Sequence, residues 1–380
     1  MGVHIILVVS IFFVIVSTHA QSVEESVRSI VGKTSYPLSL EEFKPVFHFP
    51  PVNQDTTNVC WSFSTVSFIE TEMQRLGLSP VKLSVMYPVY FAFIEKVKYF
   101  VQTKGTSRVK AGDLFTTVLS VIQTYGIVPE SVYRGQAEFS PIYNHTLLEQ
   151  ELEDYIAQVR DQKLWDEQKG VGDVKSILDR HLGVPPEQFQ FKNKTYTPLQ
   201  FAEEFVGLPW KDYLYITSFS YDSFNRYITL NVPDNWRRLD CYYNVPLDVF
   251  YNSLKSAVRT GFSVAIDGDL SEPGRYGPAD IAIIPDFDIP GSAINQQARE
   301  LRFEQGSTTD DHLMQVVGYT NSKVGDWFLV KDSWRDAWQG KYKGYFFFSG
   351  DFIKLKVLAY LVHKDGIPEI TKLIPLSDQK

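Results

Sequence analysis

The spacing of apolar residues changes along the chain, from helical in the first part to strand-like in the last part. Val66, Ile69 and Met73 recur at helical spacing. Short apolar runs bounded by turn residues follow one another between residues 228 and 364. Helices and strands that occupy separate stretches are typical of the α+β class rather than of alternating βαβ units. We therefore expect an α+β fold in which a helical lobe packs against an antiparallel, β-barrel-like lobe.

A length of 380 residues suffices for two or three domains, and the pattern indicates six segments. An amphipathic helix is expected at residues 113–125, a charged helix at 147–164 and a polar helix at 173–182. Strands are expected at 262–266, 281–284, 314–319, 327–331, 345–348 and 357–362. The expected segments are 1–20, a signal peptide; 21–42, a polar lead-in; 43–132, a helical lobe; 133–227, a helix-rich insertion; 228–364, a β-rich lobe; and 365–380, a C-terminal tail.

The N-terminus has the pattern of an export signal. Residues 5–16 are apolar, and small residues at Thr18 and Ala20 suit cleavage after Ala20. The run is too short to cross about 30 Å of hydrocarbon comfortably as a helix. The segment before it lacks Lys and Arg, so an uncleaved anchor is the alternative. We expect a periplasmic or secreted protein with no membrane association after signal removal.

Composition narrows the classes of partner. The net charge is −8 and no long run of one sign occurs, which argues against nucleic acid as the main partner. Aromatic residues make up 14% of the chain, enough for a large core and aromatic-lined clefts. No phosphate-binding loop, paired-glycine fingerprint or His/Cys metal spacing occurs, so we expect no cofactor and no metal.

Cys60 is the first candidate for chemistry. A polar, turn-prone stretch precedes it, and it falls in the first turn of the helix that contains Val66. At that position the helix dipole and free N–H groups favour the thiolate, which is the nucleophilic form. The chain has two cysteines, so a disulfide between Cys60 and Cys241 is the alternative. An inert cysteine would more naturally lie in mid-helix on the apolar side.

A thiolate needs a base, and His312 is the best-placed histidine. It follows a polar segment and leads directly into the apolar strand expected at 314–319. The strand expected at 327–331 ends at Asp332, with Trp334 two residues later. Adjacent antiparallel strands would bring Asp332 beside His312, as an orienting carboxylate beside a general base.

Several segments resemble one family. Residues 54–64 resemble the active-site helix of papain-like cysteine peptidases, in which a Gln lies six residues before the nucleophile and a Trp follows it. Residues 308–319 and 327–334 resemble the His and Asn segments of the same fold. The resemblance is stronger to the bleomycin hydrolase and aminopeptidase C branch, and it covers about residues 43–369. Segments similar to that branch are YGIVPE at 125–130, PDNW at 233–236 and TTDDH at 308–312.

The resemblance implies a two-lobed papain-like fold and hydrolysis of peptide bonds, with a peptide or protein as substrate. It also implies an aminopeptidase-like enzyme and allows an oligomer. In the resembling branch the C-terminal arm lies in the cleft and limits cleavage to chain ends, and the sequence leaves open whether residues 365–380 do the same. The implied roles are Cys60 as nucleophile, His312 as general base and acid, Asp332 as its orienting partner, Gln54 with the Cys60 N–H as oxyanion hole, and Trp61 and Trp334 as supporting residues.

Three positions depart from the family pattern. Asp332 stands where the family usually has Asn, while Leu313 and Arg335 stand where Gly is common. Asp accepts a hydrogen bond from imidazole at least as well as Asn, so no required group is lost. Two alternatives stay open: a transglutaminase-like amidase, which uses Cys, His and Asp in this order, and a non-catalytic peptide-binding relative on the same fold.

Overall fold

The computed structural model describes residues 25, 29, 36–37, 39–138 and 140–375. The expected signal peptide and the last residues of the expected tail lie outside this set. None of the helices among the described residues is long and apolar enough to cross a bilayer.

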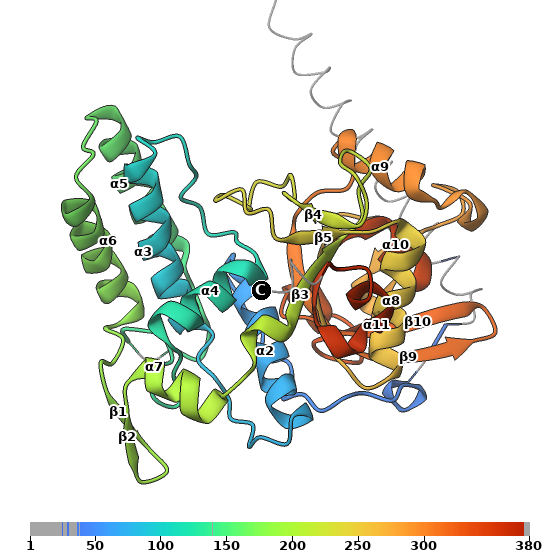
Figure 1. The fold of residues 1–380 in the computed structure, drawn as a ribbon, viewed down its shortest axis with the longest axis horizontal. Helices are drawn as coiled ribbons and strands as arrows, with labels where there is room; N and C mark the ends of the chain where they lie inside the picture. Colours follow the sequence, from blue (N-terminus) through green and yellow to red (C-terminus); the bar gives the residue numbers. More distant parts are fainter. Residues whose placement is uncertain (1–24, 26–28, 30–35, 38, 139, 376–380) are drawn as a thin grey trace, which may run out of the picture.

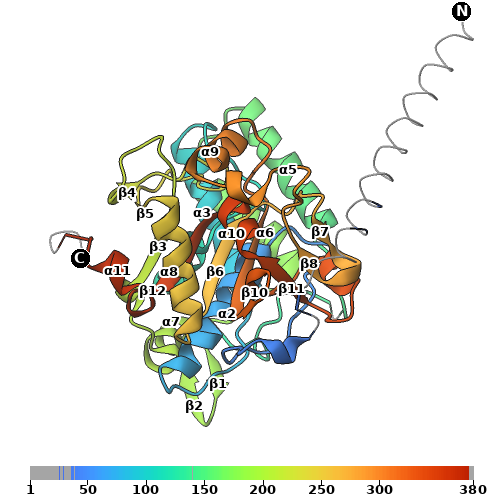
Figure 2. The same ribbon diagram turned by 90° about the vertical axis from the view of Figure 1, so that its right-hand side faces the viewer.

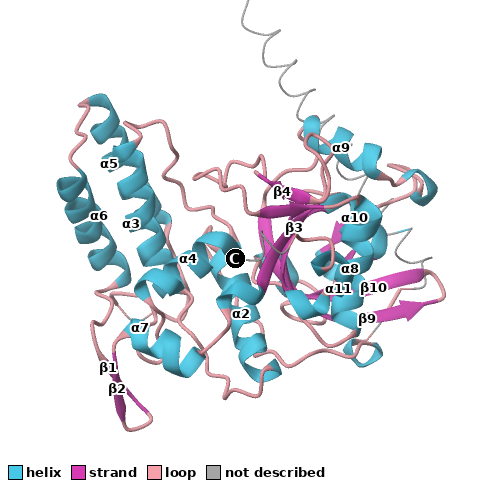
Figure 3. Cartoon of the chain, viewed as in Figure 1, coloured by secondary structure: helices cyan, strands magenta, loops and turns pink. Residues whose placement is uncertain are grey.

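Helices occupy one side of the molecule and a large sheet the other (Figures 1 and 3). In the helical part, α3 packs against α6 and α4, and α5 packs against α6. The helices are α2 (Cys60–Arg75), α3 (Met86–Gln102), α4 (Phe115–Tyr125), α5 (Thr146–Asp161), α6 (Glu167–Leu182), α7 (Pro198–Phe201), α8 (Leu247–Arg259), α9 (Gln296–Glu304), α10 (Gly350–Lys356) and α11 (Pro368–Thr371).

Helix α2 lies between the helical part and the sheet. Its residues from Cys60 to Met73 are all buried, because it contacts β9 on one side and α4 and α3 on the other. A helix buried on all sides is typical of a position inside the core. It ends at Arg75, and Gly77 follows with a φ of 75°, the left-handed conformation that glycine adopts without strain.

The sheet has ten strands in the order β4-β5-β3-β12-β6-β9-β10-β11-β8-β7. Most neighbouring pairs are antiparallel, but β3 with β5 and β8 with β11 are parallel. The strands are β3 (Tyr213–Thr217), β4 (Arg226–Ile228), β5 (Tyr242–Asn244), β6 (Val264–Gly268), β7 (Arg275–Tyr276), β8 (Ile281–Ala282), β9 (His312–Ser322), β10 (Gly325–Lys331), β11 (Tyr345–Ser349) and β12 (Val357–His363). A separate hairpin pairs β1 (Phe189–Phe191) with β2 (Lys194–Tyr196).

The central strands are buried on both faces. In β12, Leu358 and Leu361 belong to the core shared with α2, whereas Tyr360 and Val362 belong to a second core shared with α8 and α10. Figure 2 shows α8 on the opposite side of the sheet from α2. Burial on both faces explains why these strands appear in the sequence as continuous apolar runs.

The α+β plan predicted from the sequence is confirmed. The four strands expected between residues 314 and 362 fall within β9, β10, β11 and β12, and the three expected helices coincide with α4, α5 and part of α6. Strand β3 was not predicted, and it lies inside the segment expected to be a helix-rich insertion. It pairs with β12, which is far away in the sequence. Its five residues by themselves do not predict a strand, and the pairing with β12 is what stabilises it.

Candidate active site

Cys60 is the first residue of α2, and the turn before it is held by reciprocal hydrogen bonds. The Gln54 side-chain amide donates to the Thr57 carbonyl (2.8 Å), and the Thr57 hydroxyl donates to the Gln54 carbonyl (2.8 Å). The first N–H groups of a helix have no acceptor within the helix and favour a nearby anion. The Leu313 N–H also donates to Cys60 Sγ at 3.5 Å. The thiol therefore lies in the first turn of a helix and accepts a hydrogen bond from the sheet.

His312 opens strand β9, and Asp332 follows the last residue of β10, the antiparallel neighbour of β9. His312 Nε2 lies 2.7 Å from Asp332 Oδ1, and Cys60 is close enough to the imidazole to raise the pKa of His312. Because Nε2 faces the carboxylate, Nδ1 is the nitrogen left for the thiol. The structure thus brings together the three side chains that the sequence singled out as nucleophile, base and orienting group.

His312 and Asp332 each stabilise the charged form of the other. Burial alone would lower the pKa of His312, but the charges of Asp332 and Cys60 outweigh it and raise the pKa to about 10. Burial would likewise raise the pKa of Asp332, yet His312 and Arg275 bring it down to about 2. At neutral pH the pair is therefore an imidazolium and a carboxylate.

Arg275 is a residue of the cluster that sequence reasoning missed. Its guanidinium lies 3.0 Å from Asp332 Oδ2 and 3.0 Å from Asp336 Oδ2, and its side chain is only 4% exposed. The backbone N–H of Trp334 donates to the other Asp332 oxygen at 2.7 Å. Asp332 is thus saturated with donors from three directions, an environment suited to a carboxylate rather than to an amide. No local motif marks Arg275, since it lies on the short strand β7, distant in sequence from its partner.

Gln54 and Trp334 lie beside the cluster. The Gln54 side chain is fixed by Ser333, whose hydroxyl donates to its carbonyl oxygen at 2.7 Å. One amide hydrogen of Gln54 serves Thr57, and in the described part of the chain no further acceptor engages the second. The Trp334 ring stands edge-on to His312, with 6.0 Å between ring centres. Trp61 is packed in the core, where its Nε1 donates to the Ala111 carbonyl at 2.9 Å, and it also lines the cavity beside Cys60.

These groups open onto a cavity of about 310 Å³. Gln54, Cys60, His312 and Trp334 line one part of it, and several aspartates line another. The volume is enough for one or two amino-acid residues of a ligand, at the lower end of the range for small-molecule pockets.

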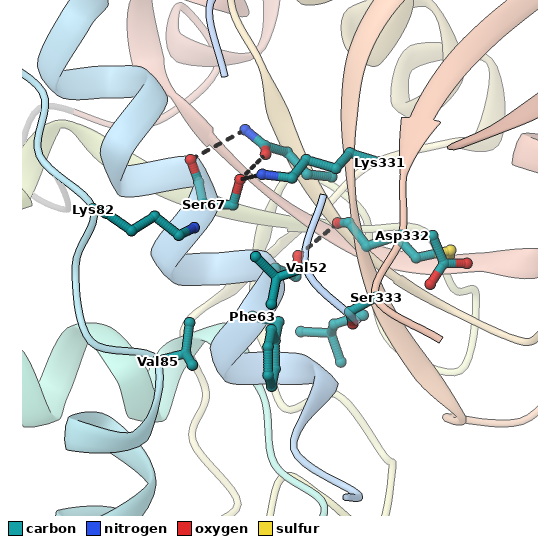
Figure 4. A pocket seen from close by; sticks show the side chains of 12 residues that line it. Val52, Phe63, Ser67, Lys82, Val85, Lys331, Asp332 and Ser333 are labelled. Carbon is teal, nitrogen blue, oxygen red and sulfur yellow. Dashed lines mark hydrogen bonds between the residues drawn. The ribbon is translucent and has the colours of Figure 1, made fainter. Parts of the chain in front are cut away.

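A second cavity lies behind the cluster, between α2 and the sheet (Figure 4). It measures about 20 Å³, room for about one water molecule. Lys331 points into it and donates to the Ser67 hydroxyl at 2.6 Å. Burial, with Lys82 nearby, lowers the pKa of Lys331 to about 7. This cavity is a packing feature rather than a substrate site.

Both cysteines are free, which excludes the alternative of a disulfide between Cys60 and Cys241. Burial raises the pKa of the Cys241 thiol to about 12, so this thiol stays protonated and unreactive. Within the described ranges, no three His, Cys, Asp or Glu side chains are arranged to hold a metal ion.

A thiol on a helix that faces an imidazole on the sheet defines the class of papain-like cysteine peptidases, and this protein is a member of that class. Residues 40–375 match the Peptidase C1-like family, to which the chain therefore belongs.

The chain is similar to aminopeptidase C from Streptococcus thermophilus, at 25% identity over 82% of this chain and 80% of that protein. Aminopeptidase C from Listeria monocytogenes is also 25% identical, over 88% of this chain and 86% of that protein. Among solved structures, PepW from Lactobacillus rhamnosis HN001 has the same fold. Its TM-score is 0.66 at 18% identity, with 92% of this chain and 90% of that chain covered.

Proposed function

We propose that this cysteine peptidase is an aminopeptidase that uses Cys60 as nucleophile and His312 as general base and acid. The observation that carries the proposal is the placement of Cys60 and His312 in one ligand-sized cavity, with His312 hydrogen-bonded to Asp332. The relatives named aminopeptidase C support the preference for chain ends.

In the proposed reaction, the Cys60 thiolate attacks the carbonyl carbon of the scissile peptide bond. Negative charge moves to the carbonyl oxygen, where the Cys60 N–H and the free amide hydrogen of Gln54 are the candidate donors. Such preplaced donors typically contribute about 3 kcal/mol to transition-state stabilisation. When the tetrahedral intermediate collapses, His312 gives its Nδ1 proton to the leaving amine.

The second half of the reaction regenerates the enzyme. His312, now neutral, takes a proton from water as the water oxygen attacks the thioester of Cys60. The acid product leaves, and Cys60 and His312 return to thiolate and imidazolium. Asp332 keeps the ring oriented throughout and stabilises its charged form, while Arg275 holds the far oxygen of Asp332.

The direct test combines labelling with turnover. The protein should hydrolyse leucine 7-amido-4-methylcoumarin in the presence of a reducing agent, and EDTA should leave the rate unchanged. Iodoacetamide should stop turnover by alkylating Cys60, and Cys60→Ser should remove both labelling and activity. Cys241→Ser serves as the matched control and should retain both. Activity lost to EDTA and restored by zinc would contradict the proposal, as would peptide binding without any turnover.

We also propose export, on the strength of the apolar run at residues 5–16 and the small residues before Gln21. N-terminal sequencing of the protein from the periplasm or culture medium should begin at Gln21. Recovery from the cytoplasm with the first twenty residues intact would contradict export.

A further inference from the structure

One wall of the cavity beside Cys60 carries carboxylates that no cation neutralises. Asp234, Asp310 and Asp311 all line this cavity. Among the described residues, none of the three has a lysine or arginine nitrogen within ion-pair distance. Other acids near the site do have such partners: Asp332 pairs with Arg275 at 3.0 Å and Asp113 with Lys96 at 2.9 Å.

Behind this wall lies a fully buried carboxyl group, Asp267 on β6. Neither of its oxygens receives a hydrogen bond from an N–H or a hydroxyl of the described residues. Its polar neighbour is the carboxyl of Asp310, with which it can share a proton. Burial and the charge of Asp310 raise the pKa of Asp267 well above its usual range, so Asp267 is the protonated donor of the pair. Asp310 is the member that meets the cavity.

Asp234 is held close to the same place. Its backbone N–H donates weakly to Asp310 Oδ2 at 3.4 Å, and its carboxylate lies directly against Gly112. A Cβ atom at Gly112 would stand 2.2 Å from Asp234 Oδ2, so only glycine leaves room for this carboxylate.

The nearest cation is already engaged. Burial raises the pKa of Asp234, and Lys96 only partly offsets this shift. The Lys96 ammonium pairs with Asp113 and donates to the carbonyls of Lys110 (2.8 Å) and Gly112 (2.6 Å). Arg108, the other cation that acts on Asp234, is exposed to solvent. The charge of the acidic wall therefore remains available to a ligand.

The acidic wall adjoins the nucleophile. Asp310 is two residues before His312. Asp267 is paired across the sheet with Leu313, whose N–H donates to Cys60 Sγ. A substrate whose carbonyl lies at Cys60 would therefore share one cavity with Asp234 and Asp310.

We propose that Asp310 and Asp234 form a subsite that binds a protonated amine of the substrate next to the scissile bond. An ammonium group brings a positive charge and three N–H donors, and among the described residues no cationic donor pairs with these carboxylates. The amine can be the free α-amino group of the peptide or a lysine or arginine side chain beside the scissile residue. The inference rests on the proposed peptidase function and deepens it, because it gives a physical basis for cleavage at amino-terminal ends.

The subsite should be sensitive to pH. Burial and the charge of Asp234 raise the pKa of Asp310 to about 7, against a smaller lowering by the hydrogen bond from Asp267. The other titratable groups nearby are Asp311, which shifts Asp310 further upward, and Asp113, which acts on Asp234. Asp310 gains its charge between about pH 6 and 8, and KM for a protonated amine should fall over that range.

The experiment compares three substrates: leucine 7-amido-4-methylcoumarin, its N-acetyl derivative, and N-acetyl-arginyl-leucine 7-amido-4-methylcoumarin. Asp310→Asn and Asp234→Asn remove the charge and keep the shape. Asp161→Asn, an exposed aspartate at the end of α5, is the matched control. We expect Asp310→Asn to raise KM at least tenfold for substrates with the bound amine, with kcat changed less than threefold and the N-acetyl leucine substrate unaffected.

The substrates distinguish the two sources of the amine. An effect on the free leucine substrate alone identifies the α-amino group, and an effect on the arginyl substrate alone identifies a basic side chain. Equal changes for all three substrates, or changes no larger than those of Asp161→Asn, would overturn the subsite.

A binding measurement separates this proposal from the proposed function. In Cys60→Ser protein, calorimetric titration should show leucinamide binding at least tenfold tighter than N-acetyl-leucinamide, and Asp310→Asn should abolish the difference. Absence of turnover in the unmodified protein would defeat the peptidase proposal, whereas equal binding of leucinamide, N-acetyl-leucinamide and N-acetyl-arginyl-leucinamide would defeat the subsite.

Discussion

Two groups of carboxylates flank His312, and they have opposite electrostatic settings. Asp332 receives hydrogen bonds from His312, Arg275 and the Trp334 backbone, and its pKa falls to about 2. Asp267 is also fully buried and Asp310 is half-buried, but these two face each other, and the pKa of Asp310 rises to about 7. Burial acts in the same direction on both groups, so the difference comes from the neighbouring cations. Asp332, which pairs with Arg275, serves the protein's own active site. Asp310, which has no cationic partner among the described residues, is available to a ligand.

The largest effect is expected from replacing His312, whose imidazole lies between the two groups of carboxylates. His312→Ala should lower kcat by at least about a thousandfold, because the general base and acid is lost. Circular dichroism should show an unchanged fold. His181→Ala, on the surface of α6, is the control and should leave kcat within twofold. A His312→Ala enzyme that retained substantial turnover would remove His312 from the mechanism.

The next-largest effect is expected from replacing Arg275, the cation that pairs with Asp332. Arg275→Gln should lower the free energy of unfolding by about 3 kcal/mol, because Asp332 Oδ2 would stay buried without its charged partner. Asp332→Asn alone should also be costly, since its amide would turn an N–H₂ group toward the Arg275 guanidinium.

The double variant sharpens this test. In Asp332→Asn with Arg275→Gln, the glutamine oxygen can accept from the new amide. Urea unfolding of the two single variants and the double variant should therefore show a loss smaller than the sum of the single losses. Additive losses would show that Arg275 and Asp332 do not act as a pair.

A third prediction concerns the alkaline limit of activity. The pKa of His312 is raised from 6.5 to about 10, chiefly by Asp332, against the effect of burial. The thiolate–imidazolium form should therefore persist to about pH 10. In the double variant without the Asp332 charge, the alkaline limb of kcat/KM should move to lower pH. An alkaline limb at the same pH in both proteins would contradict the proposed influence of the Asp332 charge on His312.

The same shift affects stability. Because the pKa is higher in the folded state, the stabilisation by charged His312 is fully present below pH 6.5 and is lost as the pH rises through about 10. The free energy of unfolding from urea titrations should decline over this window, and less so in His312→Ala.

The smallest effect is expected from replacing Asp267, the buried carboxyl group beside Asp310. Asp267→Asn keeps a neutral donor toward Asp310 but removes a group whose folded-state pKa lies well above its unfolded value of about 3.8. Such a group destabilises the fold progressively as the pH rises above the unfolded pKa. Asp267→Asn should therefore increase the free energy of unfolding at pH 8 by about 1 kcal/mol or more, with little change at pH 4. A decrease at pH 8 would show that Asp267 is charged and stabilised by its surroundings.

Much of the architecture could be predicted because it depends on local patterns. The apolar spacing after Cys60 is sufficient to predict α2, and the runs that became β9 to β12 are long and apolar enough to predict strands. The boundary residues that matter most, Cys60 at a helix start and His312 at a strand start, are visible in the same patterns. Strand β3 was missed because its residues pair with β12, which lies more than a hundred positions later.

The sequence by itself determined the α+β class, the family resemblance and the candidate set of Cys60, His312, Asp332 and Gln54, since these depend on residue types at fixed spacings. Only the tertiary structure decided the electrostatic setting of each group. The fold brings Arg275 to Asp332 and leaves Asp310 facing Asp267 without a cation, and in both cases the partners come from separate strands or loops. Electrostatic interactions depend on distance in space and on burial, and neither quantity is encoded in local spacing.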